Sequence, residues 1–334
     1  MKKKHIYIYS PSGAVRDKAA FKRGIARLQT LGHEVEVDPD ALTSYQRFAD
    51  NDATRLAAIH RATASGADVA LISRGGYGLT RILPGIQYKK VARAIDKGLC
   101  FVGISDFTAF QNAVLAKTGA ITWAGPALCE GFGVGGKPDE AAPAAGESLA
   151  PDDIMEACFD DLLQGQGEGT GWRQPLVRRS NGIENVADGR IKERATASYA
   201  IHDSVLWGGN LTVLTSLLGT PYFPQIKGGI LFLEDIAEHP YRIERMLTQL
   251  LHAGVLARQK AILMGQFTDF KLLSHDRGFK LQTVMDWLRS KTKAPVLTNL
   301  PYGHVQTKVL LPVGAKVDLG VEGRDAMLVW GHVT

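Results

Sequence analysis

Short apolar runs alternate with longer amphipathic stretches from His5 onward. The runs have the length of strands, and the stretches between them carry apolar residues at helical spacing. Strands buried on both faces read as continuous hydrophobic runs, as Val69-Ala70-Leu71-Ile72 does. The pattern therefore predicts a parallel sheet flanked by helices, with strands at His5–Tyr9, Glu34–Val37, Asp68–Ser73 and Leu99–Ile104 and helices at Val15–Leu31, Tyr45–Ser65 and Phe107–Lys117.

The pattern changes in the middle of the chain. Between Gly131 and Asp153, glycine, proline, alanine and acidic residues dominate without an apolar period, which indicates a flexible linker or a surface insertion. Organised sequence resumes near Trp172 and is clear from Ser204. We therefore expect an N-terminal α/β domain over residues 1–128, a variable segment over 129–198 and a C-terminal domain over 199–334.

The C-terminal part mixes strand and helix patterns. Ile230–Asp235 has the pattern of a buried strand that ends in two acids, and Pro240 suits the first position of a helix. Ala261–Met264 predicts another strand, and Lys280–Arg289 predicts a helix. The alternation of apolar and polar residues from Lys308 to Val333 is typical of antiparallel strands, so this domain is predicted as mixed β and α structure.

Composition limits the classes of function. A chain of 334 residues with 45% hydrophobic and 22% charged residues is expected to fold as two globular cores. The net charge of +5 is modest and lacks a basic stripe with interleaved aromatics, so no nucleic-acid partner is expected. No segment approaches the ~20 apolar residues of a membrane span, and His5–Tyr9 is too short for a signal peptide core. Three widely spaced cysteines favour reduced thiols, so the cytoplasm is expected; no residue pattern indicates a metal site or a cofactor.

Ser105 follows a predicted buried strand and precedes a predicted helix. In open α/β sheets the carboxyl ends of strands line the reactive crevice, so a serine on this turn is a candidate nucleophile. Serine is also a preferred N-cap, and helix capping is the simpler interpretation of this segment alone. Phe107 stands where a nucleophile elbow carries its second glycine, so the general motif is incomplete.

A glycine-rich turn, Ser73-Arg74-Gly75-Gly76-Tyr77-Gly78, follows another predicted strand. Its backbone N–H groups could approach an anion or a developing oxyanion closely. The third glycine of a dinucleotide fingerprint is missing, and no Walker lysine follows, which disfavours nucleotide binding. The alternative is a tight turn that only needs positive φ.

A nucleophilic serine needs a base, and the C-terminal part offers candidates. Glu234 ends a predicted buried strand, and His304 lies in a predicted loop. A histidine that is oriented by a carboxylate can take the proton of a serine. Asp235 and Glu238 compete with Glu234, and the residues alone do not decide among them.

Several blocks in this order resemble the serine LD-carboxypeptidases over nearly the whole chain. The resemblance is weakest between Gly131 and Tyr199. The blocks that carry it are Ser73-Arg74-Gly75-Gly76-Tyr77-Gly78, Gly103-Ile104-Ser105-Asp106-Phe107-Thr108, Trp207-Gly208-Gly209-Asn210-Leu211, Leu233-Glu234-Asp235-Ile236-Ala237-Glu238-His239-Pro240 and Gly303-His304.

The resemblance implies a flavodoxin-like N-terminal domain that carries the nucleophile Ser105 and a C-terminal domain that supplies Glu234 and the general base His304. It also implies an oxyanion hole from the backbone of Asp106 and of Gly75 or Gly76. The implied reaction removes the terminal D-alanine from a murein tetrapeptide during cytoplasmic recycling of cell-wall fragments, and the family's habit of dimerising implies a homodimer.

Substrate contacts are expected from residues beside these blocks, namely Arg74, Tyr77, Trp207 and Asn210. Arg74 and Tyr77 flank the glycine turn, and Trp207 could equally belong to the core, because aromatic residues are mostly buried. Two alternative functions stay open. One is a microcin-immunity type peptidase that uses the same triad on a peptidyl-nucleotide amide, and the other is a non-catalytic protein that holds an anionic ligand at the two turns.

Overall fold

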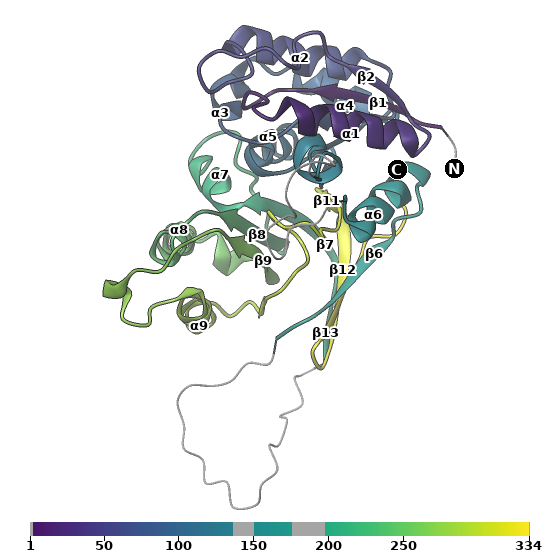
Figure 1. Cartoon of the computed structure of the whole chain (residues 1–334). Helices are drawn as coiled ribbons and strands as arrows, with labels where there is room; N and C mark the ends of the chain where they lie inside the picture. The colour runs from purple at the N-terminus through teal and green to yellow at the C-terminus, as the bar shows by residue number, and fades with distance from the viewer. Residues whose placement is uncertain (1–2, 136–149, 176–197, 334) are drawn as a thin grey trace, which may run out of the picture.

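The computed structural model describes residues 3–135, 150–175 and 198–333, which form two β-sheets surrounded by helices (Figure 1). The strands are β1 His5–Tyr9, β2 Glu34–Val37, β3 Val69–Ile72, β4 Cys100–Gly103, β5 Thr122–Ala124, β6 Gly169–Arg173, β7 Tyr199–Asn210, β8 Ile230–Ile236, β9 Ala261–Thr268, β10 Val296–Leu297, β11 Leu311–Val313, β12 Lys316–Glu322 and β13 Asp325–Val329. The α-helices are α1 Lys18–Thr30, α2 Asp52–Ala64, α3 Leu79–Ile82, α4 Tyr88–Ile95, α5 Thr108–Thr118, α6 Asp153–Gln164, α7 Leu211–Ser216, α8 Pro240–His252 and α9 Leu281–Lys291.

The first sheet has the strand order β2-β1-β3-β4-β5-β11, and its first five strands are parallel. This is the order of flavodoxin-like folds, which place their ligands at the carboxyl ends of the strands. The predicted strands His5–Tyr9 and Glu34–Val37 are confirmed with their bounds. The chain returns from its C-terminal part to this sheet, because β11 pairs antiparallel with β5.

Side chains of β1 alternate between two hydrophobic cores, as the pleat of a strand requires. Ile6 and Ile8 pack in one core with residues of α1 and α6, while Tyr7 and Tyr9 pack in another with residues of α2, α4 and α5. Helices thus cover both faces of the sheet, which explains why its inner strands β1, β3 and β4 are largely apolar, whereas the edge strand β2 alternates glutamate and valine.

The segment predicted as a linker is structured at both ends. Gly131 and Phe132 are buried in a π-helical turn, Leu128–Phe132, and Asp153 begins α6. The ring centroids of Phe132 and Phe159 lie 5.0 Å apart, and Arg27 of α1 donates to Glu156 of α6 at 2.7 Å. The linker prediction for Gly131–Asp153 is therefore wrong at its ends, because apolar side chains there complete the core against α1; residues 136–149 and 176–197 lie outside the described part.

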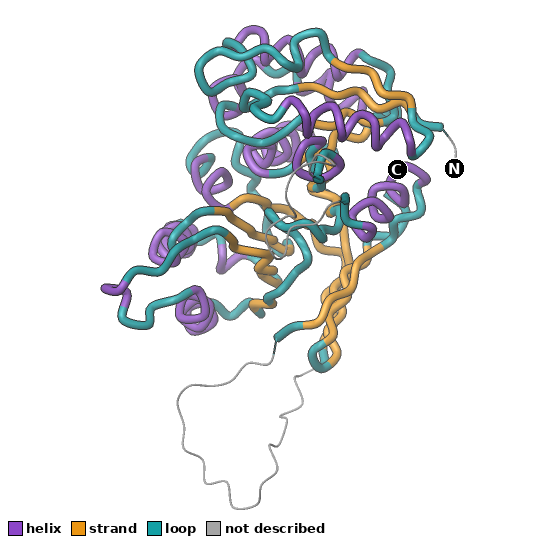
Figure 2. The backbone as a smooth tube through the Cα atoms, in the orientation of Figure 1, coloured by secondary structure: helices purple, strands orange, loops and turns teal. Residues whose placement is uncertain are grey.

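The second sheet has the order β10-β9-β8-β7-β12-β13-β6. Its first four strands are parallel, and the following pairs are antiparallel, which confirms the antiparallel pattern predicted for the end of the chain. In Figure 2 the antiparallel strands form an orange ribbon that extends away from the helices, whereas the parallel strands lie beside α7, α8 and α9. The predicted mixed β and α character of this part is present.

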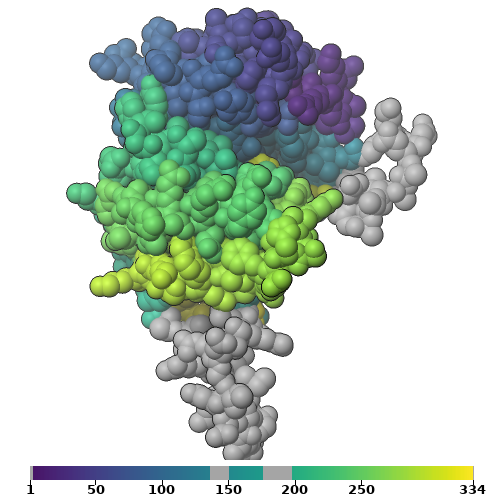
Figure 3. Space-filling model, turned by 90° about the vertical axis from the view of Figure 1, so that its left-hand side faces the viewer, coloured from purple at the N-terminus to yellow at the C-terminus, as the bar shows by residue number. Residues whose placement is uncertain are grey.

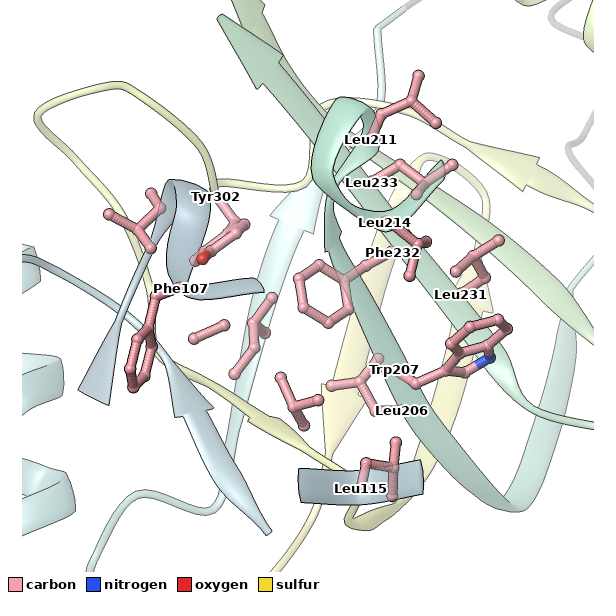
Figure 4. Close-up of a cluster of buried hydrophobic side chains, with 14 of the residues drawn as sticks. Phe107, Leu115, Leu206, Trp207, Leu211, Leu214, Leu231, Phe232, Leu233 and Tyr302 are labelled. Carbon is pink, nitrogen blue, oxygen red and sulfur yellow. The ribbon is translucent and has the colours of Figure 1, made fainter. Parts of the chain in front are cut away.

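The two parts of the chain share one apolar core. Phe107 and Leu115 from the first part lie in the same cluster as Leu206, Phe232 and Tyr302 from the second (Figure 4). Figure 3 shows the blue surface of the first part in direct contact with the green surface of the second. The two parts are therefore fixed against each other, so that loops from both can build one site.

Candidate active site

Ser105 occupies a sharp turn between β4 and α5. Its φ of +66° is left-handed, a conformation that costs a non-glycine residue roughly 1–3 kcal/mol. Neither the 3-10 turn Ser105–Phe107 nor α5 has a side-chain cap, and Ser105 Oγ forms no hydrogen bond within the described part of the chain. The capping interpretation of Ser105 is therefore wrong, because this strained turn leaves its hydroxyl free of the helix.

The glycine turn lies against Ser105, since β3 and β4 are neighbouring parallel strands. A Cβ on Gly75 would lie 2.6 Å from Ser105 Cβ and 2.8 Å from its Oγ, so only glycine allows this approach. Gly76 has a φ of +121°, and the Gly75 carbonyl accepts a hydrogen bond from Gly13 N–H at 3.2 Å. The turn thus has the positive φ that favours glycine, as a tight turn requires, and it also contacts the serine.

The side chain of Asp106 ties the loops around Ser105 together. It is 2% exposed and accepts hydrogen bonds from Ser12 Oγ at 2.5 Å and from the Leu79 N–H at 2.9 Å. Burial raises the pKa of Asp106, and these two hydrogen bonds oppose the rise. The backbone N–H of Asp106 belongs to the first turn after β4, where N–H groups lack helical partners.

Glu234 and His304 form a hydrogen-bonded pair. Glu234 is fully buried on β8, and its Oε2 lies 2.8 Å from His304 Nδ1. The other oxygen, Oε1, accepts from Asn210 Nδ2 at 3.2 Å. Burial lowers the pKa of His304, but the hydrogen bond and the charge of Glu234 outweigh it and raise that pKa above the usual value.

The structure distinguishes among the three acids. Asp235 accepts from Asn210 Nδ2 at 2.9 Å and from Thr212 Oγ1 at 2.7 Å, and burial raises its pKa to about 6. Glu238 pairs with Arg242 at 3.6 Å. Of these three acids, only Glu234 forms a hydrogen bond with His304. The pairing of β8 with β9 shifts register between Leu233 and Asp235, at the place where both acids lie beside Asn210.

One open cavity of about 530 Å³ joins these groups. Ser105 and the glycines 75 and 76 line it from the first part of the chain, and His304 lines it from the second. No hydrogen bond connects Ser105 Oγ to His304 among the residues the structure describes, although such bonds often tighten only when substrate is bound. The residues that line the cavity are Arg74, Gly75, Gly76, Ile104, Ser105, Glu130, Ile236, His304, Val305, Gln306 and Lys308.

The predicted substrate contacts have different locations. Arg74 lines the cavity, where it donates to the Ala14 carbonyl at 3.1 Å and pairs with Glu130 at 3.5 Å. Tyr77 is 45% exposed and lies beside Phe48, outside the cavity lining.

Trp207 and Asn210 are both buried. Trp207 is fully buried among apolar side chains (Figure 4), and its indole N–H donates to Gln259 Oε1 at 2.9 Å. The prediction of Trp207 as a substrate contact is therefore wrong, because its ring fills the core. Asn210 caps α7 through Val213 N–H and holds the two acids, so its amide is already engaged.

Among residues 3–135, 150–175 and 198–333, no group of three histidine, cysteine or acidic side chains is arranged to hold a metal ion. None of the described helices is long and apolar enough to cross a membrane.

Comparisons with known proteins identify the family. Residues 6–125 match the LD-carboxypeptidase N-terminal domain, and residues 203–319 match the LD-carboxypeptidase C-terminal domain. The chain belongs to the LD-carboxypeptidase family. This LD-carboxypeptidase is 35% identical to the muramoyltetrapeptide carboxypeptidase from Oxalobacter formigenes, whose crystal structure it matches with a TM-score of 0.78 over 99% of this chain and 100% of that one. The two-part α/β fold class is thereby confirmed.

Two further relatives are similar to this chain over most of its length. A probable murein peptide carboxypeptidase of Bacillus subtilis is 28% identical over 305 residues, 91% of this LD-carboxypeptidase and 85% of the relative. The microcin C7 self-immunity protein MccF of Escherichia coli is 26% identical over 271 residues, 75% of this chain and 70% of the relative. A structure of MccF with aspartyl sulfamoyl adenosine, at 22% identity and a TM-score of 0.79, supports the fold alone.

Sequence reasoning missed three features of this LD-carboxypeptidase site. These are the Asp106 side chain that joins the loops, the Asn210 amide that holds both acids, and Lys308 in the cavity lining. Asn210 follows two glycines at the end of a strand, which was a usable signal for a capping side chain. Lys308 gave none, because a lysine near the end of a loop is ordinarily solvated.

Proposed function

We propose that this LD-carboxypeptidase hydrolyses the bond between meso-diaminopimelate and the terminal D-alanine of murein tetrapeptides, with Ser105, His304 and Glu234 as its triad. The observation that carries the proposal is the 2.8 Å hydrogen bond between His304 Nδ1 and Glu234 in a cavity that Ser105 also lines. A carboxylate on Nδ1 fixes the tautomer in which Nε2 can accept a proton.

The proposed reaction begins when His304 Nε2 removes the proton from Ser105 Oγ. The oxygen attacks the carbonyl carbon of the diaminopimelate residue, and the carbonyl oxygen becomes an oxyanion. The Asp106 N–H and an N–H of the Gly75 and Gly76 turn receive this charge. His304 then protonates the amine of the departing D-alanine, and a water molecule activated by the same histidine releases the acyl group from Ser105.

Close approach and strain support these roles. Ser105 has the left-handed φ of a nucleophile on a strand-to-helix turn, and Gly75 contacts its side chain. Glu234 has no other cationic contact within 4.0 Å among the described residues, so the imidazolium that forms during catalysis would find a matched buried partner.

The test is D-alanine release from purified tetrapeptide by Ser105→Ala. We expect turnover to fall by several orders of magnitude, because the attacking hydroxyl is lost. The unfolding temperature should stay near that of the wild type, because Ser105 Oγ forms no hydrogen bond with the described residues. Ser290→Ala, at an exposed helical serine, is the matched control and should keep full activity. Near-normal release by Ser105→Ala would refute the triad.

The microcin-immunity type of activity is the competing proposal within the family. It is distinguished by comparing turnover of murein tetrapeptide with turnover of an aminoacyl-nucleotide analogue by the same preparation. We expect the tetrapeptide to be preferred, in line with the 35% identity to a muramoyltetrapeptide carboxypeptidase. A preference for the nucleotide conjugate would replace the proposed substrate and leave the triad in place.

We place the activity in the cytoplasm and expect a homodimer without nucleic acid. Cys100, Cys129 and Cys158 are all free thiols, which suits a reducing compartment. Sedimentation of the purified protein tests the dimer, since a single species with the 36.2 kDa mass of one chain would contradict it.

A further inference from the structure

Lys308 is a buried lysine in the wall of the candidate active site. It is 3% exposed, follows His304 by four residues on the loop that leads to β11, and lines the same cavity as Ser105. Its ammonium forms no hydrogen bond and no ion pair with any residue that the structure describes. Removing most of a lysine side chain from water without a partner for its ammonium is costly, and here burial lowers the pKa of Lys308 although the charges of nearby acids oppose the change.

The other cation of the cavity is already engaged. The Arg74 guanidinium donates to the Ala14 carbonyl at 3.1 Å and pairs with Glu130 at 3.5 Å. Among the described residues Lys308 has no comparable contact, and the charges of nearby acids act on it only from a distance. An anionic ligand in the cavity would therefore be its first direct partner and would offset part of the cost of burying this lysine.

The position of one substrate anion follows from the reaction of a carboxypeptidase. The terminal carboxylate of the peptide is attached to the same Cα as the amine that leaves, so the two groups are neighbours. In the proposed reaction His304 protonates that amine. Lys308 lies on the same loop and is close enough for its charge to oppose protonation of His304.

We propose that the Lys308 ammonium binds the terminal carboxylate of the substrate and thereby makes this enzyme cleave only the last residue. This inference rests on the proposed function, because it takes the leaving group to lie beside His304. Binding to the second carboxylate of the diaminopimelate side chain is the competing role, and it predicts a different response to changes at the peptide end.

The first experiment compares a tetrapeptide that ends in D-alanine with the same peptide ending in D-alanine amide. For the wild type we expect kcat/KM to be about 100-fold higher for the free acid, the size expected when one partner of a buried charge pair is removed. In Lys308→Met the free acid should lose about 100-fold and the amide little, so that the preference falls below about threefold. Lys293→Met, at an exposed lysine, should keep the wild-type preference.

Equal losses on both peptides would overturn the proposal and favour the diaminopimelate carboxylate or a structural role. The unfolding temperature separates a structural role further. Because methionine is about as long as lysine and carries no charge, Lys308→Met should unfold at or above the wild-type temperature. If Lys308→Met is destabilised, Lys308→Gln is used in the same comparison of the two peptides, because the glutamine amide is neutral but still polar.

A binding measurement keeps the inference independent of turnover. Calorimetry of Ser105→Ala with an N-acyl-D-alanine and with its amide should show tighter binding of the acid, and Lys308→Met in that background should remove the difference. If the wild type does not release D-alanine but this binding difference is present, the proposed function fails and the Lys308 site stands. If the acid and the amide bind equally, the Lys308 site fails whatever the enzyme hydrolyses.

Discussion

Gly75→Ala tests whether the glycine turn sets the position of Ser105, the proposed nucleophile. The added Cβ would lie 2.6 Å from Ser105 Cβ and 2.8 Å from its Oγ, whereas non-bonded carbons prefer about 3.5–4.0 Å. One of the two groups must therefore move by about 1 Å. Gly75 is not among the residues with positive φ, so its backbone conformation tolerates alanine and the clash is the main perturbation.

Neither group can move freely. The Gly75 carbonyl accepts a hydrogen bond from Gly13 N–H, and Ser105 is held in a left-handed turn between β4 and α5. A misplacement of about 1 Å at a reacting group costs about 100-fold in rate, or about 2.7 kcal/mol of transition-state stabilisation. Overpacking also costs about 1–3 kcal/mol of unfolding free energy.

The assay combines kcat/KM for D-alanine release with urea denaturation of the same preparation. Gly320→Ala is the matched control, because no atom lies within 4 Å of the added Cβ in that strand. We expect Gly320→Ala to retain activity and Gly75→Ala to lose about 100-fold at a denaturant midpoint that still leaves it folded. Activity of Gly75→Ala within about threefold of the wild type would refute the contact argument.

Two further predictions concern the groups that hold the site. Because Glu234 raises the pKa of His304, the protonated and inactive imidazolium persists to higher pH in the wild type. Glu234→Gln should lower kcat by about 10²–10⁴-fold and move the acidic limb of the kcat/KM profile to lower pH, whereas Glu238→Gln, at the half-buried acid that pairs with Arg242, should leave the limb in place. An unmoved limb in Glu234→Gln would contradict the pairing. Asp106→Ala should lower the free energy of unfolding in urea by roughly 1–3 kcal/mol for each of the two buried donors it leaves unpaired, while Asp96→Ala on the surface changes it little. A loss no larger than that of the control would show that other acceptors replace the carboxylate.

Hydrophobic periodicity was sufficient to predict strands β1 to β4 of the first sheet and helices α1, α2 and α5, but it missed the short strands β5 and β11 and the helices α3 and α4. A strand covered by helices on both faces must be apolar throughout, so its pattern is visible without its neighbours. The same pattern failed for the segment after residue 130. The π-helical turn there has only a few apolar positions, and its core partners in α1 lie a hundred residues earlier, which no local window can detect.

The sequence by itself determined which residues have the chemistry for catalysis. Ser105, Glu234 and His304 were candidates from residue type and from the expected ends of strands, and the family resemblance chose Glu234 among three acids. The tertiary structure decided which groups meet. In the structure Glu234 lies 2.8 Å from His304, Ser105 does not cap the helix that follows it, and Trp207 is buried in the core. These outcomes depend on the packing of two distant parts of the chain and on side-chain direction, neither of which local sequence encodes.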